Sequence, residues 1–97
     1  MRAPELSRAA ERDVAEIYAW TEAQFGSAQA DRYGDALVAR MEQVAEQPSL
    51  GRSVEGSAEG TLRIALGRHF IYYREIATGI RVLRVLHQRM LQDPQLN

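Results

Sequence analysis

The sequence contains no cysteine and no lysine, and it contains only two histidines. The absence of cysteine excludes disulfide frameworks, thiolate zinc sites and cysteine nucleophiles. His69 and His87 are too few to predict a metal site, so we expect neither a metal nor another cofactor. No apolar run approaches the roughly 20 residues that span a bilayer, and the N-terminus lacks a signal-peptide pattern. We therefore expect a soluble, cytoplasmic protein that forms a single domain over residues 1–97.

Charge is distributed unevenly along the chain. All twelve basic residues are arginine, and the thirteen acidic residues bring the formal net charge to −1. Residues 1–60 hold six arginines and eleven acidic residues, whereas residues 61–97 hold six arginines and two acidic residues, a local charge of +4. A preference for arginine codons explains the missing lysines but not this asymmetry. Because arginine forms planar, bidentate contacts with carboxylates and phosphates, the C-terminal part predicts an acidic partner.

Two amphipathic helices are predicted in the first half of the chain. Ser7 is a candidate N-cap, and Gly26 suits the end of the first helix. Ser27 starts the second helix, which Pro48 ends. The predicted apolar or small stripes are Ala10, Val14, Ile17, Thr21 and Phe25 in the first helix and Ala30, Tyr33, Leu37, Met41 and Val44 in the second. The tight junction predicts an antiparallel hairpin, on which Asp13, Glu16, Asp31 and Asp35 are interpreted as solvated carboxylates.

Strand patterns follow a glycine- and serine-containing segment, Pro48–Gly60, which is predicted to be a loop. Hairpin signals at Gly67-Arg68 and at Ala77-Thr78-Gly79 separate three runs of β-forming residues. Met1–Leu6 predicts a further short strand at an edge. The three runs are Thr61–Leu66, His69–Ile76 and Ile80–His87. The expected fold is α+β, with an N-terminal short strand and an antiparallel helical hairpin packed on a three- to four-stranded antiparallel sheet.

The last predicted strand carries apolar residues on both faces. Ile80, Val82 and Leu86 point to one face by strict alternation, and Leu83 and Val85 point to the other. Because two helices cover only one face of a small sheet, we expect apolar surface beside arginines to remain for a partner. The alternative is that the loop and the C-terminal tail fold back over that face.

The residues offer little catalytic chemistry. No serine is spaced to pair with a histidine and an acid, and no phosphate-binding loop motif is present. RNA cleavage needs a general base, a general acid and positive charge, for which His87 and Glu55 or Glu59 are candidates. A structural role for His87 and His69 is the competing interpretation. The arginines that could stabilise a phosphate are Arg63, Arg68, Arg74, Arg84 and Arg89.

Short motifs along most of the chain have a familiar order and spacing. They are Leu6-Ser7 with Ala10, Asp13 and Ile17-Tyr18; Phe25-Gly26 with Gln29-Ala30 and Tyr33; Pro48 with Gly51-Arg52; Gly67-Arg68-His69 with Ile71-Tyr72-Tyr73-Arg74; and Ile80 through Met90. Together they resemble the RelE/ParE toxin superfamily, and most specifically the ParE toxins of ParD–ParE type II toxin–antitoxin modules. The closing run from Arg84 to Met90 makes the resemblance specific.

The resemblance implies a bacterial toxin that is neutralised by a ParD-like antitoxin with an acidic, amphipathic C-terminal segment. It also implies inhibition of DNA gyrase rather than enzymatic activity, with operator DNA contacted only through the antitoxin. The competing hypotheses are a RelE-like, ribosome-dependent endoribonuclease that uses His87 with Arg63 or Arg74, and a non-toxic member that only binds an antitoxin-like protein. No catalytic residue is expected. The candidate contacts with the target or antitoxin are Arg68, Arg74, Arg84, His87, Gln88, Arg89 and Met90.

Overall fold

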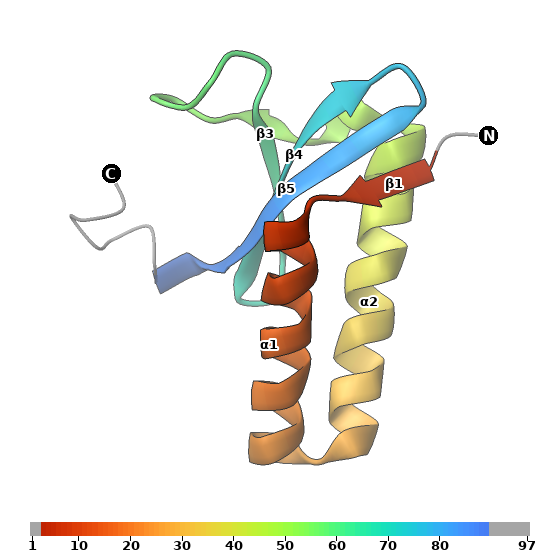
Figure 1. Ribbon diagram of the computed structural model, residues 1–97, viewed down its shortest axis with the longest axis vertical. Helices are drawn as coiled ribbons and strands as arrows, with labels where there is room; N and C mark the ends of the chain where they lie inside the picture. Colours follow the sequence, from red (N-terminus) through yellow and green to blue (C-terminus); the bar gives the residue numbers. More distant parts are fainter. Residues whose placement is uncertain (1–2, 90–97) are drawn as a thin grey trace.

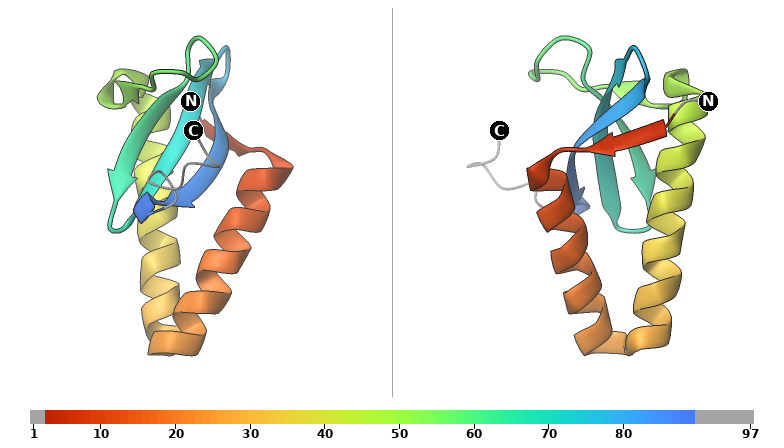
Figure 2. Two further views of the ribbon diagram at one scale, coloured as in Figure 1. Left: turned by 90° about the vertical axis from the view of Figure 1, so that its left-hand side faces the viewer. Right: turned by 45° about the vertical axis from the view of Figure 1, so that its right-hand side comes forward.

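The computed structural model describes residues 3–89, which form a helical hairpin packed on one mixed sheet. The far end of the hairpin projects beyond the sheet (Figures 1 and 2). This architecture confirms the predicted α+β class. In chain order the elements are β1 (Ala3–Leu6), α1 (Arg8–Phe25), α2 (Ser27–Glu46), a short 3₁₀ turn η1 (Pro48–Leu50), β2 (Arg52–Ser53), β3 (Leu62–Leu66), β4 (His69–Ile76) and β5 (Gly79–His87).

The helical hairpin forms where the sequence predicts it. The Ser7 hydroxyl caps α1 by accepting a hydrogen bond from the backbone N–H of Ala10 at 3.0 Å. Gly26 joins α1 to α2 with a φ of 91°, a conformation that glycine adopts at little cost. One expectation is wrong, because Phe25 is 65% exposed and does not continue the buried stripe. The end of α1 lies beyond the sheet, so this side chain has no core to enter (Figure 1).

The sheet has five strands in the order β1-β5-β4-β3-β2, one more than the largest number predicted. The additional strand is β2, which pairs with β3 inside the segment predicted to be a loop. The N-terminal strand β1 pairs with β5 in the parallel direction, so the sheet is not wholly antiparallel as predicted. No turn joins β1 to β5, because the whole helical hairpin and the other strands lie between them in sequence. Short-range turn signals therefore could not specify their relative direction.

A β-bulge changes which residues of β5 face the helices. Tyr72 is paired with Arg84 and Tyr73 with Val82, which leaves Leu83 as an extra residue between the two pairs. An extra residue inverts the alternation of side chains that follow it. Val85 therefore joins Val82 in the buried core, and the prediction that it lies on the opposite face is wrong.

The core lies between the sheet and the hairpin. Its largest fully buried side chains are Tyr73, Leu37, Met41, Ile71, Ile80, Val44 and Val82. Tyr73 satisfies its hydroxyl by donating to the carbonyl of Pro48 at 2.7 Å. Gly51 lies against the Tyr73 ring, where there is no room for a Cβ atom. This packing anchors the chain as it leaves α2 and enters β2.

The face of the sheet away from the hairpin exposes less apolar surface than expected. Tyr72 is buried there, and Phe70 and Leu86 are half-buried. The Arg63 guanidinium covers the Phe70 ring, with its carbon 4.2 Å from the ring centroid. Large exposed apolar side chains lie instead on the helices, notably on α1. Within residues 3–89, no helix is both long and apolar enough to cross a membrane.

Candidate binding cleft

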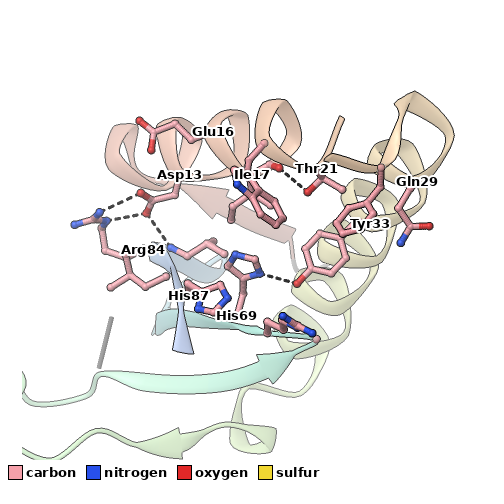
Figure 3. Close-up of a pocket in the computed structure, with 15 residues that line it drawn as sticks. Asp13, Glu16, Ile17, Thr21, Gln29, Tyr33, His69, Arg84 and His87 are labelled. Carbon is pink, nitrogen blue, oxygen red and sulfur yellow. Dashed lines mark hydrogen bonds and ion pairs between the residues drawn. The ribbon is translucent and has the colours of Figure 1, made fainter. Parts of the chain in front are cut away.

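A cleft of about 680 Å³ opens between α1, the N-terminal part of α2 and the ends of β4 and β5 (Figure 3). Residues from the turn between β3 and β4 complete its rim. The lining residues are Asp13, Glu16, Ile17, Trp20, Thr21, Phe25, Gln29, Tyr33, Gly67, Arg68, His69, Arg84, Val85, Leu86 and His87. The cleft therefore combines residues from both halves of the chain.

The α1 wall of the cleft ends in an exposed aromatic pair. Trp20 is 59% exposed and Phe25 is 65% exposed. Their rings meet edge to face, with centroids 6.0 Å apart and an interplanar angle of 71°. Ile17, one turn before Trp20, continues this apolar surface toward the core. Because large aromatic side chains supply much of the energy of protein interfaces, this wall is suited to contact with another protein.

Asp13 joins the opposite end of the α1 wall to β5. Its carboxylate accepts hydrogen bonds from Arg84 Nε at 2.7 Å, from the second guanidinium nitrogen at 3.0 Å and from the backbone N–H of Val85 at 2.9 Å. The hydrogen bond that Arg84 donates to Asp13 is the main cause of the raised pKa of Arg84. Asp13 is only 9% exposed, so the prediction that it is a solvated surface carboxylate is wrong.

The position of β1 explains why Asp13 is buried. Pairing between β1 and β5 ends at Leu6 and Val82, so the following residues of β5 have an open edge. The Ser7 hydroxyl donates to the carbonyl of Leu83 at 2.8 Å, and Asp13 accepts from the next free N–H. The first turns of α1 thus satisfy backbone groups that a neighbouring strand would otherwise pair.

Two histidines and a tyrosine form the floor of the cleft. His69 and His87 are directly opposite each other on β4 and β5, and their ring centroids are 5.2 Å apart. The Tyr33 hydroxyl on α2 lies 2.6 Å from His69 Nδ1, as Figure 3 shows. Burial, and secondarily the charge of His87, lowers the pKa of His69 from 6.5. Burial likewise raises the pKa of Tyr33 above 10.0.

The turn before β4 closes tightly over Tyr33. Gly67 has a φ of 54°, and a Cβ atom at this position would lie 2.8 Å from the Tyr33 hydroxyl. The same hydroxyl is 3.1 Å from the carbonyl oxygen of Leu66. The turn, α2 and β4 therefore hold one another in place around the cleft floor.

Three of the seven predicted contact residues line the cleft: Arg68, Arg84 and His87. Gln88 lies beside them, since its backbone N–H donates to the carbonyl of Arg68 at 2.8 Å. The backbone N–H of Arg89 donates to His87 Nδ1 at 3.0 Å. Arg74 is opposite Arg81 on the other face of the sheet, away from the cleft. Met90 lies outside the described residues.

The residues predicted for RNA cleavage are not brought together as a set. His87 lines the cleft, but Glu55 and Glu59 do not, and Arg63 covers Phe70 on the other face of the sheet. Within residues 3–89, no group of three histidine or acidic side chains is arranged to hold a metal ion. The position of Trp20 in the cleft is not among the predictions from sequence, although its spacing of three residues from Ile17 was an available signal.

Comparison with known protein families decides the relationship. The family model described as ParE toxin of type II toxin–antitoxin system, parDE, matches residues 5–92. The chain belongs to the ParE toxin family. The toxin is 37% identical to Toxin ParE1 of Caulobacter vibrioides over 90 residues, which cover 93% of each chain. It is 36% identical over 92 residues to Toxin ParE1 of Mycobacterium tuberculosis, with 94% of each chain covered.

Solved structures show the same fold for the toxin. It is similar to a chain of the chromosomal ParDE toxin–antitoxin system from P. aeruginosa, with a TM-score of 0.75 and 18% identity over 90% of this chain and 96% of that chain. It is also similar to a chain of the toxin–antitoxin complex RelBE2 from Mycobacterium tuberculosis, with a TM-score of 0.66 and 20% identity. That match covers 89% of this chain and 96% of the other. These likenesses support the fold rather than any particular contact.

Proposed function

We propose that this type II toxin is neutralised by a ParD-like antitoxin whose acidic, amphipathic C-terminal segment binds in the cleft. The observation that carries the proposal is the exposed aromatic wall of Trp20 and Phe25 facing a basic rim. Solved relatives of this fold are named as toxin–antitoxin systems or complexes, which supports an antitoxin partner. Operator DNA would be bound by the antitoxin and not by this chain.

The chemistry of the cleft fits an amphipathic segment. An apolar side chain of the segment would pack on Trp20, Phe25 and Ile17, while its carboxylates would face Arg68 and the half-exposed Arg84. Residues 61–97 carry the net charge of +4 that such carboxylates would complement. A segment that folds as it binds buries this apolar surface at the cost of its own conformational entropy. Gln88, Arg89 and Arg74, which do not line the cleft, stay candidate contacts, and so does Met90.

We further propose that the free toxin acts without catalysis, by binding and inhibiting DNA gyrase. Membership of the ParE family supports this target. The scatter of the predicted cleavage residues over two faces of the sheet supports a binding mechanism rather than hydrolysis.

Antitoxin binding can be tested with the tryptophan of the toxin itself. The chain has one tryptophan, and Trp20 lines the cleft. A tryptophan-free peptide, taken from the C-terminal segment of the antitoxin encoded beside this chain, should shift the Trp20 emission to shorter wavelength on binding. The control variant Val38→Ala changes an exposed residue of α2 that does not line the cleft and should bind equally well. An unchanged spectrum with no binding by calorimetry would refute the proposed site.

Inhibition of gyrase is tested separately. The purified toxin should block supercoiling of relaxed plasmid by gyrase, and prior addition of the antitoxin should restore it. Normal supercoiling in the presence of a stoichiometric excess of toxin contradicts this target.

One observation favours a second candidate function, cleavage of RNA on the ribosome. His69 and His87 lie 5.2 Å apart beside Arg68, so two imidazoles and a guanidinium share one cleft. Two imidazoles can serve as general base and general acid. Mapping of mRNA 5′ ends after induction of the toxin tests this alternative, because ribosome-dependent cleavage produces new ends in register with codons. The variant His87→Gln removes one of the two imidazoles and should abolish such ends.

A further inference from the structure

Each of the paired histidines at the cleft floor uses its Nδ1 atom in a contact within the protein. We assign the single hydroxyl hydrogen of Tyr33 to the carbonyl of Leu66, 3.1 Å away. In this assignment His69 Nδ1 carries a hydrogen and donates it to the Tyr33 oxygen at 2.6 Å. His87 Nδ1 accepts from the backbone N–H of Arg89 at 3.0 Å, so neutral His87 carries its hydrogen on Nε2.

These assignments give the two rings complementary roles. Within residues 3–89, the Nε2 atoms of His69 and His87 have no hydrogen-bond partner in the protein. His87 offers an N–H donor, while neutral His69 offers a lone pair. Protonation of His69 at Nε2 would break none of its present hydrogen bonds, whereas protonation of His87 would displace the N–H of Arg89. His69 is therefore the ring that can gain a proton without losing a hydrogen bond.

Charged and titratable groups from every element around the cleft line it together with this pair. They are Asp13 and Glu16 from α1, Tyr33 from α2, Arg68 from the turn before β4, and Arg84 from β5. Asp13 is already engaged by Arg84 and by the N–H of Val85. Arg68 lines the same cleft as His69, and Glu16 is exposed to solvent on the α1 wall. An incoming carboxylate would favour the charged form of His69, because an anion near an imidazole stabilises the protonated ring.

We propose that His69 and His87 form a carboxylate-binding subsite that accepts an aspartate or glutamate side chain of the antitoxin segment and takes up one proton from solvent as it binds. The inference rests on the proposed function, since the antitoxin supplies the carboxylate. His87 donates through Nε2–H, and His69 donates through Nε2 after it gains the proton. The complex is thereby linked to pH, and the antitoxin binds more tightly in mildly acidic solution.

The uptake of one proton determines the direction and the upper limit of the pH dependence of Kd. The bound state holds the proton more strongly than the free toxin, so affinity rises as the pH falls between the two titration midpoints. The limit for one proton is about tenfold in Kd for each pH unit. Below about pH 5 the gain ends, because the carboxylate of the partner itself becomes protonated.

Calorimetry measures the proton directly. The full-length toxin and the antitoxin encoded beside it are titrated at about pH 6.5 in two buffers of different ionisation enthalpy, and the difference in heat gives the number of protons taken up. We expect an uptake of about 0.3 to 1 proton. His69→Gln and His87→Gln should reduce the uptake and flatten the pH dependence of Kd. The control Gln29→Ala removes a neutral lining side chain and should keep the uptake.

The outcomes separate this inference from the proposed function. No binding at any pH refutes the antitoxin proposal. Tight binding with no proton uptake, or with uptake unchanged in both histidine variants, overturns the carboxylate subsite and leaves the antitoxin proposal standing. Should a variant fail to fold, NMR titration of the wild-type histidine Cε1–H signals replaces it. The His69 signal must then titrate at higher pH in the complex than in the free toxin, and an unchanged midpoint overturns the subsite.

Discussion

Replacement of Asp13 by alanine should destabilise the toxin more than any other change to an acidic side chain of α1. The carboxylate is 9% exposed and accepts two hydrogen bonds from Arg84 and one from the backbone N–H of Val85. Since β1 no longer pairs with β5 at this point, no backbone carbonyl of β1 can take the place of Asp13. The substitution therefore leaves a buried donor without an acceptor and releases α1 from β5.

The stability lost in Asp13→Ala comes mainly from the backbone N–H of Val85. A buried N–H that loses its acceptor costs about 1 to 3 kcal/mol. The ion pair adds only about 0 to 1 kcal/mol, because the Arg84 side chain is 49% exposed and regains water when the carboxylate is removed. We expect a total of about 2 to 3 kcal/mol for Asp13→Ala. Asp13→Asn keeps one acceptor and should cost about half as much.

Chemical denaturation followed by circular dichroism provides the test. The matched control is Glu16→Ala, which removes an exposed carboxylate from the same helix one turn later and should change stability by no more than about 0.5 kcal/mol. For a domain of this size, the Asp13→Ala loss corresponds to a fall in Tm of about 10 to 20 °C. Equal stability of the two variants would refute the assigned role of Asp13.

Three further predictions concern the glycine within α2, the packing of Tyr73 and the cleft floor. Gly34→Ala places a Cβ 3.9 Å from Tyr18, an ordinary contact, and should stabilise α2 by about 0.5 to 1 kcal/mol in urea unfolding. Gly51→Ala forces a Cβ into the Tyr73 ring and should lower stability by about 1 to 3 kcal/mol in the same assay. In the folded toxin, burial and secondarily the charge of His87 lower the pKa of His69 from 6.5. As the pH falls, His69 therefore becomes protonated in the unfolded chain at a higher pH than in the folded toxin. Stability should therefore fall as the pH drops below 6.5, and His69→Gln should flatten this dependence.

Local features of the fold could be predicted because their signals are local. Ser7 and Gly26 mark the ends of α1 through capping and a positive φ, both of which depend on a few adjacent residues. The Gly67-Arg68 turn likewise places β3 beside β4. The family resemblance, carried by motifs over most of the chain, is confirmed by the family model over residues 5–92.

Features that depend on distant pairings could not be predicted in the same way. Asp13 looks like any helix carboxylate until β5, about seventy residues later, brings Arg84 and the N–H of Val85 to it. The extra residue Leu83 has no sequence signature, yet it decides that Val85 is buried. It also sets the register that places His87 opposite His69, so the histidine pair exists only after the bulge has formed.

The open cleft changes how the free energy of the toxin is divided between folding and binding. Burying a large aromatic side chain is worth about 1.5 to 3 kcal/mol, and Trp20 and Phe25 leave more than half of that surface in water. Phe25 is the last residue of α1, which ends beyond the sheet (Figure 2), and the Trp20 ring packs edge to face against it. Asp13 meanwhile fixes the other end of the helix to β5, so the aromatic wall is held in place before any partner arrives. A partner that binds here buries the two aromatic side chains, and little conformational entropy is lost because this wall is already ordered. The arrangement therefore favours tight association rather than added stability of the free chain.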